Sequence, residues 1–263
     1  MILLLALVLL AADPWKGDEY AKNSASQKES ANDFMKDMHL VGDESILDVG
    51  CGDGKITAAM AKAVTGDVIG VDISPSMIGF AEKAFPHVTF QVQDAAKLNF
   101  ENKFDLITSF TVMQWVLDQE GALKGFAKAL KPEGRLWIQM PTGLPSAMTQ
   151  ALEKTVAKWS SFFKDFSPPW RFYNATEYRK LLTDTHFTPT RLDVVAKHEK
   201  FPSRAAFQGF LRQWFPYLRP LPEDKKDAFL TELLDNYLQL LPVDDQGRVS
   251  FIVDRLEVEA TKS

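Results

Sequence analysis

Cysteine is nearly absent from the 263-residue sequence, which contains only Cys51. A disulfide framework is therefore excluded, and a cysteine-rich zinc site is not expected. Histidine is also scarce, and none of the four residues has the spacing of a metal-ligand pair such as H-x-x-x-H. Lysine and arginine form no basic run, and the formal net charge is −5. We expect neither a metal site nor a nucleic-acid partner.

Long apolar runs are absent except at the N-terminus, where residues 1–12 read MILLLALVLLAA. This run is too short to cross a bilayer as a helix, so we expect no integral membrane span. It has the length of the apolar part of a signal peptide, but no basic residues precede it. We expect a cytoplasmic protein, with export through a signal at residues 1–12 as the alternative. If the run is not a signal, we expect it either to pack on the folded protein or to lie upstream of the true start of translation.

Beyond residue 40, short apolar segments of strand length alternate with segments of helical periodicity. The pattern predicts strands at 45–50, 67–73, 88–92, 104–110, 135–140, 190–197 and 249–259. It predicts helices at 56–64, 75–85, 122–130, 146–159 and 175–183. This alternation is typical of a parallel sheet covered on both faces. The expected fold class is α/β: a Rossmann-like, doubly wound, mostly parallel seven-stranded sheet with a helical cap.

Two further helices with strong apolar faces are predicted around residues 207–218 and 229–238, and we expect them to cover the open end of the sheet. Near the N-terminus, Ala31, Phe34, Met35 and Met38 have the spacing of one helix face. The predicted division is an N-terminal apolar segment and cap helix at 1–40, a binding core at 41–201 and 244–263, and a helical cap insertion at 202–243.

The segment DVGCGDG, residues 48–54, follows the first predicted strand. Glycines at a strand-to-helix turn let the backbone pass close to a ligand, where a Cβ would clash. A dinucleotide fingerprint needs glycine at position 55, which is Lys55, and this disfavours a dinucleotide oxidoreductase. No G-K-[ST] follows, so a Walker loop is excluded. An ordinary tight turn is the structural alternative.

Acidic residues stand at the ends of the first three predicted strands. Asp72, 22 positions after Gly50, can accept hydrogen bonds from both hydroxyls of a ribose. Alternatively, Asp72 only caps the next helix, but Ser74 fills that role better. Asp94 can accept from an adenine amino group, with Ala95 supplying a backbone N–H. With Asp48, these carboxylates predict one nucleoside pocket.

As a set, DVGCGDG, VDIS (71–74), QDA (93–95) and FDLITSF (104–110) resemble the cofactor motifs of class I S-adenosylmethionine (SAM)-dependent methyltransferases. The resemblance covers about residues 20–140 and implies SAM as cofactor. It implies a loop around the methionine part, a ribose held by Asp72 and an adenine between Ile73 and Met77. The cofactor residues that it implies are Tyr20, Gln27, Asp48, Gly50, Cys51, Gly52, Gly54, Asp72, Ile73, Met77, Asp94, Ala95, Ser109 and Phe110.

Four shorter segments, 112–115, 138–141, 201–203 and 218–221, resemble trans-aconitate methyltransferases, which esterify a carboxylate of a small acid. This resemblance implies methyl transfer to a small-molecule carboxylic acid similar to trans-aconitate. Other carboxyl methyltransferases and malonyl-carrier-protein methyltransferases share much of it. A carrier-protein thioester or natural product as acceptor, and a non-catalytic SAM-binding protein, stay as alternatives.

A carboxylic acid acceptor has a pKa of about 4, so it is ionised at neutral pH and needs no general base. This agrees with the lack of an evident His/Asp pair, and no catalytic residue is assigned. An acidic acceptor does need positive or hydrogen-bond-donating groups. The expected acceptor residues are Gln114, Trp115, Arg171, Tyr173, Arg204 and Trp214, with Arg212 as a further candidate. For each arginine, the alternative is a solvated surface charge.

Overall fold

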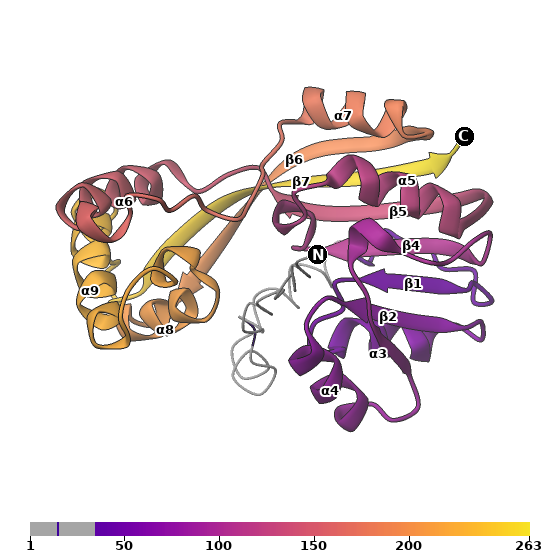
Figure 1. Ribbon diagram of the computed structural model, residues 1–263, viewed down its shortest axis with the longest axis horizontal. Coiled ribbons are helices and arrows are strands. Elements are labelled where there is room, and N and C mark those ends of the chain that lie inside the picture. Colours follow the sequence, from indigo (N-terminus) through magenta and orange to yellow (C-terminus); the bar gives the residue numbers. More distant parts are fainter. Residues whose placement is uncertain (1–14, 16–34) are drawn as a thin grey trace, which may run out of the picture.

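The computed structural model describes residue 15 and residues 35–263 (Figure 1). The predictions on residues 1–12, Ala31, Phe34, Tyr20 and Gln27 lie outside the described residues. In chain order, the strands and helices are β1 (Ile46–Val49), α3 (Lys55–Ala63), β2 (Val68–Asp72), α4 (Pro75–Ala84), β3 (Thr89–Val92), β4 (Phe104–Phe110), α5 (Gln119–Ala129), β5 (Leu130–Pro141), α6 (Ser146–Lys158), α7 (Ala175–Asp184), β6 (Phe187–Phe201), α8 (Arg204–Trp214), α9 (Glu223–Leu240) and β7 (Val249–Lys262).

The seven strands form one sheet in the order β3-β2-β1-β4-β5-β7-β6. Strands β1 to β5 pair in parallel, whereas β7 pairs antiparallel with both β5 and β6. The predicted mostly parallel seven-stranded sheet is thus confirmed. The chain reverses its direction of winding between β1 and β4, and ligands of such sheets bind at the carboxyl ends beside this reversal.

Both faces of the sheet are covered, because successive residues of each strand point to opposite sides. On one face, Ile46 of β1 packs with Met60 of α3 and Trp137 of β5. On the other face, Leu47 packs in a cluster that contains Phe126 of α5 and Tyr178 of α7. Ser74 caps α4 as predicted, because its hydroxyl accepts from the Met77 N–H at 3.1 Å.

Two predicted strands extend further than the sequence pattern indicated. β6 and β7 remain paired from Phe187↔Lys262 to Phe201↔Val249. β5 begins before the predicted strand at 135–140, and its pairing with β4 jumps from Phe104↔Leu130 to Leu106↔Arg135. Among the described residues, no helix combines the length and apolarity needed to span a membrane.

Helices α6, α8 and α9 form a lobe beyond the carboxyl ends of the parallel strands, around the extended ends of β6 and β7 (Figure 1). Its core joins Leu152 of α6, Phe207 of α8 and Phe229 of α9 with Phe251 of β7. The expected helices of residues 202–243 are therefore present, but they pack together with α6, which the predicted insertion did not include. The domain boundaries at 40, 201 and 243 stay a prediction.

Candidate functional site

The glycine loop between β1 and α3 has a backbone that only glycine adopts easily. Gly50, Gly52 and Gly54 have φ of 76°, 53° and 77°, in the left-handed region. A Cβ on Gly50 would lie 2.1 Å from a methyl carbon of Val112. The loop is also tied to the next strand, because the N–H groups of Gly50 and Cys51 both donate to the Val71 carbonyl. Sequence and packing thus fix the loop tightly against the sheet.

Asp48 lies beneath this loop and is 2% exposed. Its carboxylate accepts hydrogen bonds from the hydroxyls of Thr57, at 2.6 Å, and Thr108, at 2.9 Å. Burial raises the pKa of Asp48 to about 6, although these two hydrogen bonds act to lower it. Asp48 does not line the cavity that Asp72 and Asp94 share. The expectation that three strand-end carboxylates face one cavity therefore needs correction: Asp72 and Asp94 line it, and Asp48 lies beneath the loop.

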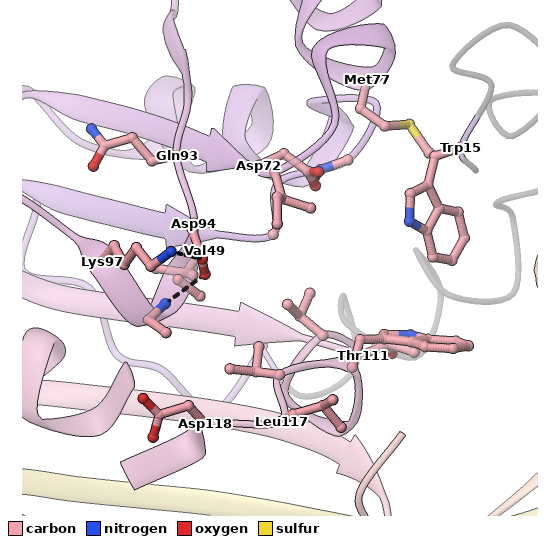
Figure 2. Close-up of a pocket in the computed structure, with 18 of the residues that line it drawn as sticks. Trp15, Val49, Asp72, Met77, Gln93, Asp94, Lys97, Thr111, Leu117 and Asp118 are labelled. Atoms are coloured by element: carbon pink, nitrogen blue, oxygen red, sulfur yellow. Dashed lines mark hydrogen bonds and ion pairs between the residues drawn. The ribbon is translucent and has the colours of Figure 1, made fainter. Parts of the chain in front are cut away.

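A cavity of about 430 Å³, the cofactor cavity, opens at the carboxyl ends of β1, β2, β3 and β4. Figure 2 shows Asp72 and Asp94 around the same opening, with Met77 and Trp15 on one side and Leu117 and Asp118 across from them. Its lining residues are Trp15, Val49, Gly50, Gly52, Asp72, Ile73, Met77, Gln93, Asp94, Ala95, Ala96, Lys97, Phe110, Thr111, Val112, Trp115, Val116, Leu117 and Asp118.

Backbone N–H groups orient both carboxylates of the cofactor cavity. Asp72 accepts from the N–H of Gly52 at 3.0 Å and from that of Ser74 at 2.9 Å. Asp94 accepts from the Ala96 N–H at 2.9 Å, and its other oxygen lies 3.7 Å from Nζ of Lys97. Each carboxylate oxygen can accept more than one hydrogen bond, so both groups retain capacity toward a polar ligand.

Apolar side chains complete the cofactor cavity. Ile73 and Leu117, both lining it, are 62% and 60% exposed, which is unusual for large apolar residues. Met77, by contrast, is buried at 3%. Exposed apolar surface beside oriented carboxylates suits a ligand that has a flat ring and a polyhydroxylated part.

The other predicted cofactor residues lie behind the cavity wall. Ser109 is buried, and its hydroxyl donates to the Val49 carbonyl at 3.0 Å, which joins the ends of β4 and β1. Burial raises the pKa of the Cys51 thiol well above its usual range, and the Asp72 and Asp48 carboxylates add to this shift. Cys51 is therefore a packing residue of the loop. Of the predicted set, Asp48, Cys51, Gly54 and Ser109 do not line the cavity, whereas Gly50, Gly52, Asp72, Ile73, Met77, Asp94, Ala95 and Phe110 do.

A second cavity of about 90 Å³, the acceptor cavity, adjoins the first. Trp15, Thr111 and Trp115 line both cavities. The ring centroid of Trp115 lies 5.6 Å from that of Trp170 and 6.4 Å from that of Trp214, so three indoles gather at this place. The lining residues are Trp15, Thr111, Gln114, Trp115, Pro141, Gly143, Leu144, Trp170, Phe172, Glu199, Phe210, Trp214, Phe251, Val253 and Arg255.

Thr111 stands at the junction of the two cavities in a left-handed conformation, with φ of 60°. Such a backbone is a genuine outlier for a β-branched residue and persists only where neighbours hold it. Its N–H donates to the Gln139 carbonyl at 2.7 Å, and its carbonyl accepts from Gln114 Nε2 at 3.0 Å. Its hydroxyl accepts from Arg255 Nη1 at 2.9 Å. The junction is thus fixed from three sides.

Arg255 is the main residue of the acceptor cavity that the sequence reasoning missed. It is 5% exposed, and its Nη2 donates to Glu199 Oε1 at 3.0 Å. Residues 251, 253 and 255 alternate along β7, so Arg255 lies on the same buried face as Phe251 and Val253. The sequence did contain this signal, because Arg255 occupies a position of the predicted strand 249–259 at which the alternation of apolar residues indicates a buried side chain.

The structure brings three of the six predicted acceptor residues to this cavity: Gln114, Trp115 and Trp214. Arg171 instead stacks over the Tyr173 ring, and both line a separate surface hollow along α5 and α7. Arg204 binds Asp235 at 2.6 Å and the Thr231 carbonyl at 2.8 Å, within the helical lobe. Arg212 pairs with Glu223 and Asp227. These arginines have structural partners outside both cavities.

Residues 46–134 match the family model described as a methyltransferase domain. The chain is thereby supported as a SAM-dependent methyltransferase, because the matched segment contains the glycine loop and the strand ends that line the cofactor cavity. It is 27% identical to the trans-aconitate 2-methyltransferase of Methylobacterium nodulans over 259 residues, 95% of this chain and 98% of that protein. It is 27% identical to the juvenile hormone acid O-methyltransferase of Drosophila melanogaster over 210 residues, 74% of this chain and 71% of that protein. A crystal structure of a proposed methyltransferase from Bacillus halodurans C-125 has the same fold, with a TM-score of 0.64, 19% identity, and coverage of 89% of this chain and 99% of that one.

Proposed function

We propose that this methyltransferase transfers a methyl group from SAM to a carboxylate oxygen of a small acid. The observation that carries the proposal is the acceptor cavity itself. Among the described residues that line it, the ionisable groups are Arg255 and Glu199, which are paired with each other. A phenol or amine acceptor usually wants a general base, whereas a carboxylate is already ionised and needs a positive partner.

The residues of the cofactor cavity fit the adenosyl group. Asp72 would accept from the ribose hydroxyls, and Asp94 with the N–H of Ala95 would bind the adenine edge. The exposed side chains of Ile73 and Leu117 would contact the adenine ring. Gly50 and Gly52 line the cofactor cavity, so the loop backbone would lie beside the methionine part of SAM.

The chain's own contribution to the reaction would be alignment and exclusion of water. When bound, SAM supplies a methyl group on a sulfonium; as the new O–CH₃ bond forms, the S–CH₃ bond breaks and its electrons stay on sulfur. The carboxylate and the sulfonium both become neutral, and no proton moves. Thr111 and Trp115, at the junction of the cavities, would direct the acceptor oxygen toward the methyl group.

The helical lobe would serve as the cap expected from the sequence. Phe210 and Trp214 of α8 form part of the acceptor cavity wall, so the lobe contributes directly to the acceptor site. The two relatives described above support the reaction class, since trans-aconitate 2-methyltransferase and juvenile hormone acid O-methyltransferase are both named for an acid.

A turnover screen with methyl-labelled SAM tests the proposal. Matched acids, phenols, amines and thiols of equal carbon skeleton are offered, and the labelled product is identified. We expect methyl esters from acids alone. Turnover on phenols or amines without turnover on any acid would contradict the proposal, and binding of SAM without any turnover would favour a non-catalytic SAM-binding protein. Methylation of a thioester-linked carrier protein, with no free acid accepted, would favour that alternative.

A further inference from the structure

Three buried polar atoms without a hydrogen-bond partner belong to residues that line the acceptor cavity. They are Nε of Arg255, Nε1 of Trp214 and Oε1 of Gln114. Because buried polar groups in proteins are nearly always paired, several unpaired groups around one cavity indicate that a ligand supplies the missing partners. Two of the three atoms are N–H donors, and a carboxylate only accepts.

Arg255 has donors to spare for a ligand. Its two observed hydrogen bonds, to Thr111 and Glu199, use two of the five N–H groups of a guanidinium. The side chain is held between β6, which carries Glu199, and the junction residue Thr111, so little conformational freedom is lost when a ligand binds. A guanidinium fixed in this way is suited to a carboxylate, which it can contact at two oxygens.

The charge of the acceptor cavity limits how many carboxylates it can take. Glu199 already balances Arg255 at 3.0 Å, and among the described lining residues no other side chain carries charge. One carboxylate can share the guanidinium with Glu199. The second or third carboxylate of a polyacid would lie against indole and phenyl rings without a partner, which is costly.

The walls of the acceptor cavity suit a ligand whose main part is apolar. The lining residues of the cavity include five aromatic side chains: Trp115, Trp170, Trp214, Phe210 and Phe251. An open hollow of about 330 Å³ along α6 lies behind the same wall, since Leu144, Trp170 and Phe172 line both it and the acceptor cavity. Its other side chains include Leu152 and Val156. The hollow is also lined by Thr149 and Glu153, and a tail longer than the small cavity would contact the side formed by Leu152 and Val156.

We propose that the acceptor is a monocarboxylic acid with an apolar body and that Arg255 is the residue that binds its carboxylate. This inference rests on the proposed methylation of acids and narrows it, because a polyacid such as trans-aconitate is then a poor acceptor. Gln114 and Trp214 complete the contacts to the acid, and the aromatic wall contacts its apolar part.

A series of acids tests the substrate class. The straight-chain acids from butanoate to decanoate are compared with trans-aconitate and citrate by methyl-ester formation and by quenching of tryptophan fluorescence in the presence of S-adenosylhomocysteine. Each added methylene should lower KM about three- to fourfold until the apolar surface is filled. Efficient esterification of the polyacids with none of the apolar monoacids would overturn the inference and leave the proposed function intact. Turnover of 1-octanol or octylamine, but of no acid, would instead contradict the proposed function.

Paired variants test Arg255 itself. Arg255→Gln combined with Glu199→Gln removes both charges, so that neither remains buried alone, and should raise KM for octanoate roughly 10- to 100-fold. Glu199→Gln alone leaves Arg255 free for the acid and should lower KM, which a merely structural role for the pair does not predict. Arg204→Gln, on α8 outside both cavities, is the matched control and should leave KM unchanged.

SAM affinity, measured by calorimetry on each variant, establishes that the fold is kept. If the double variant binds SAM normally and retains the parent KM for octanoate, Arg255 does not bind the acid. Equal increases in KM for both Glu199→Gln and the double variant would also exclude the assigned role.

Discussion

The two cavities share a wall but are built in different ways. The cofactor cavity consists of strand ends that follow one another in the chain, and its carboxylates are oriented by main-chain N–H groups such as those of Gly52 and Ala96. The acceptor cavity includes side chains from a short 3-10 helix (Met113–Trp115), α8, β6 and β7, which are far apart in the sequence. Backbone geometry therefore defines the first site and side-chain packing defines the second. Substitutions should separate the two in their effects on SAM and on the acid.

The largest effect on SAM binding is expected from substitution of Gly50. In Gly50→Ala, a Cβ would lie 2.1 Å from Val112 in a backbone with φ of 76°, so the loop must shift. We expect SAM affinity to fall by about 100-fold or more, equivalent to about 2.8 kcal/mol. Calorimetric titration with SAM measures this loss. Gly79→Ala, where no atom lies within 4 Å of the new Cβ, is the control and should bind SAM like the parent. Parent-like affinity in Gly50→Ala would mean that the loop does not define the cofactor site.

Asp48, which lies beneath the loop, should make the free energy of unfolding depend on pH. Since the folded pKa of Asp48 is about 6, against 3.8 as its usual value, the folded state holds the proton more tightly than the unfolded state does. Its favourable contribution is complete below about pH 4 and is lost as pH rises through 6. Relative to Asp48→Asn, the free energy of unfolding should therefore fall by up to about 3 kcal/mol over this window.

Denaturant titrations of both proteins from pH 4 to pH 8 measure this difference. Asp105→Asn gives the opposite sign, because hydrogen bonds from Lys131 and the Ser45 N–H outweigh burial and lower the pKa of Asp105. Its parent loses stability relative to the variant as pH falls below about 4, the ordinary pKa of an aspartate, so the titrations of this pair continue below pH 4. A pH-independent difference for Asp48→Asn would show that this carboxyl is not held in the buried environment described.

The smallest effect is expected at the acceptor cavity. Trp214→Phe keeps an aromatic ring but removes the unpaired Nε1–H. The KM for an apolar acid should rise about three- to tenfold, in line with the loss of one hydrogen bond, while SAM affinity stays constant. Trp159→Phe, whose Nε1 bonds Glu232 in the lobe, is the control. If Trp214→Phe changed SAM affinity but not the KM for the acid, the assignment of Trp214 to the acceptor cavity alone would be contradicted.

The sequence predicted the cofactor side of the molecule well because its signals are local. The seven predicted strands are all present along the chain, and the ends of β1, β2 and β3 carry the motifs that bring Asp72 and Asp94 to one cavity. Asp48 was misjudged because a strand-end position does not reveal whether a carboxylate points into a cavity or, as here, toward Thr57 and Thr108 beneath the loop.

The acceptor side was harder to predict because its residues meet only through tertiary packing. Arg171 and Arg204 look the same in sequence as Arg255, yet of the three only Arg255 lines the acceptor cavity, and what distinguishes it is the alternation of β7. The position of Thr111, next to a predicted strand end, gave no indication of its left-handed backbone. Side-chain partners formed across 50 or more positions, such as Glu199 with Arg255, leave no local pattern.

A crystal structure of the protein with S-adenosylhomocysteine and octanoate tests the central claim most directly. The account predicts ribose hydroxyls within hydrogen-bond distance of Asp72 and the octanoate carboxylate within hydrogen-bond distance of Arg255, with the alkyl chain along Trp170. An octanoate carboxylate bound at Arg171, or a nucleoside bound away from the ends of β1 and β2, would contradict it.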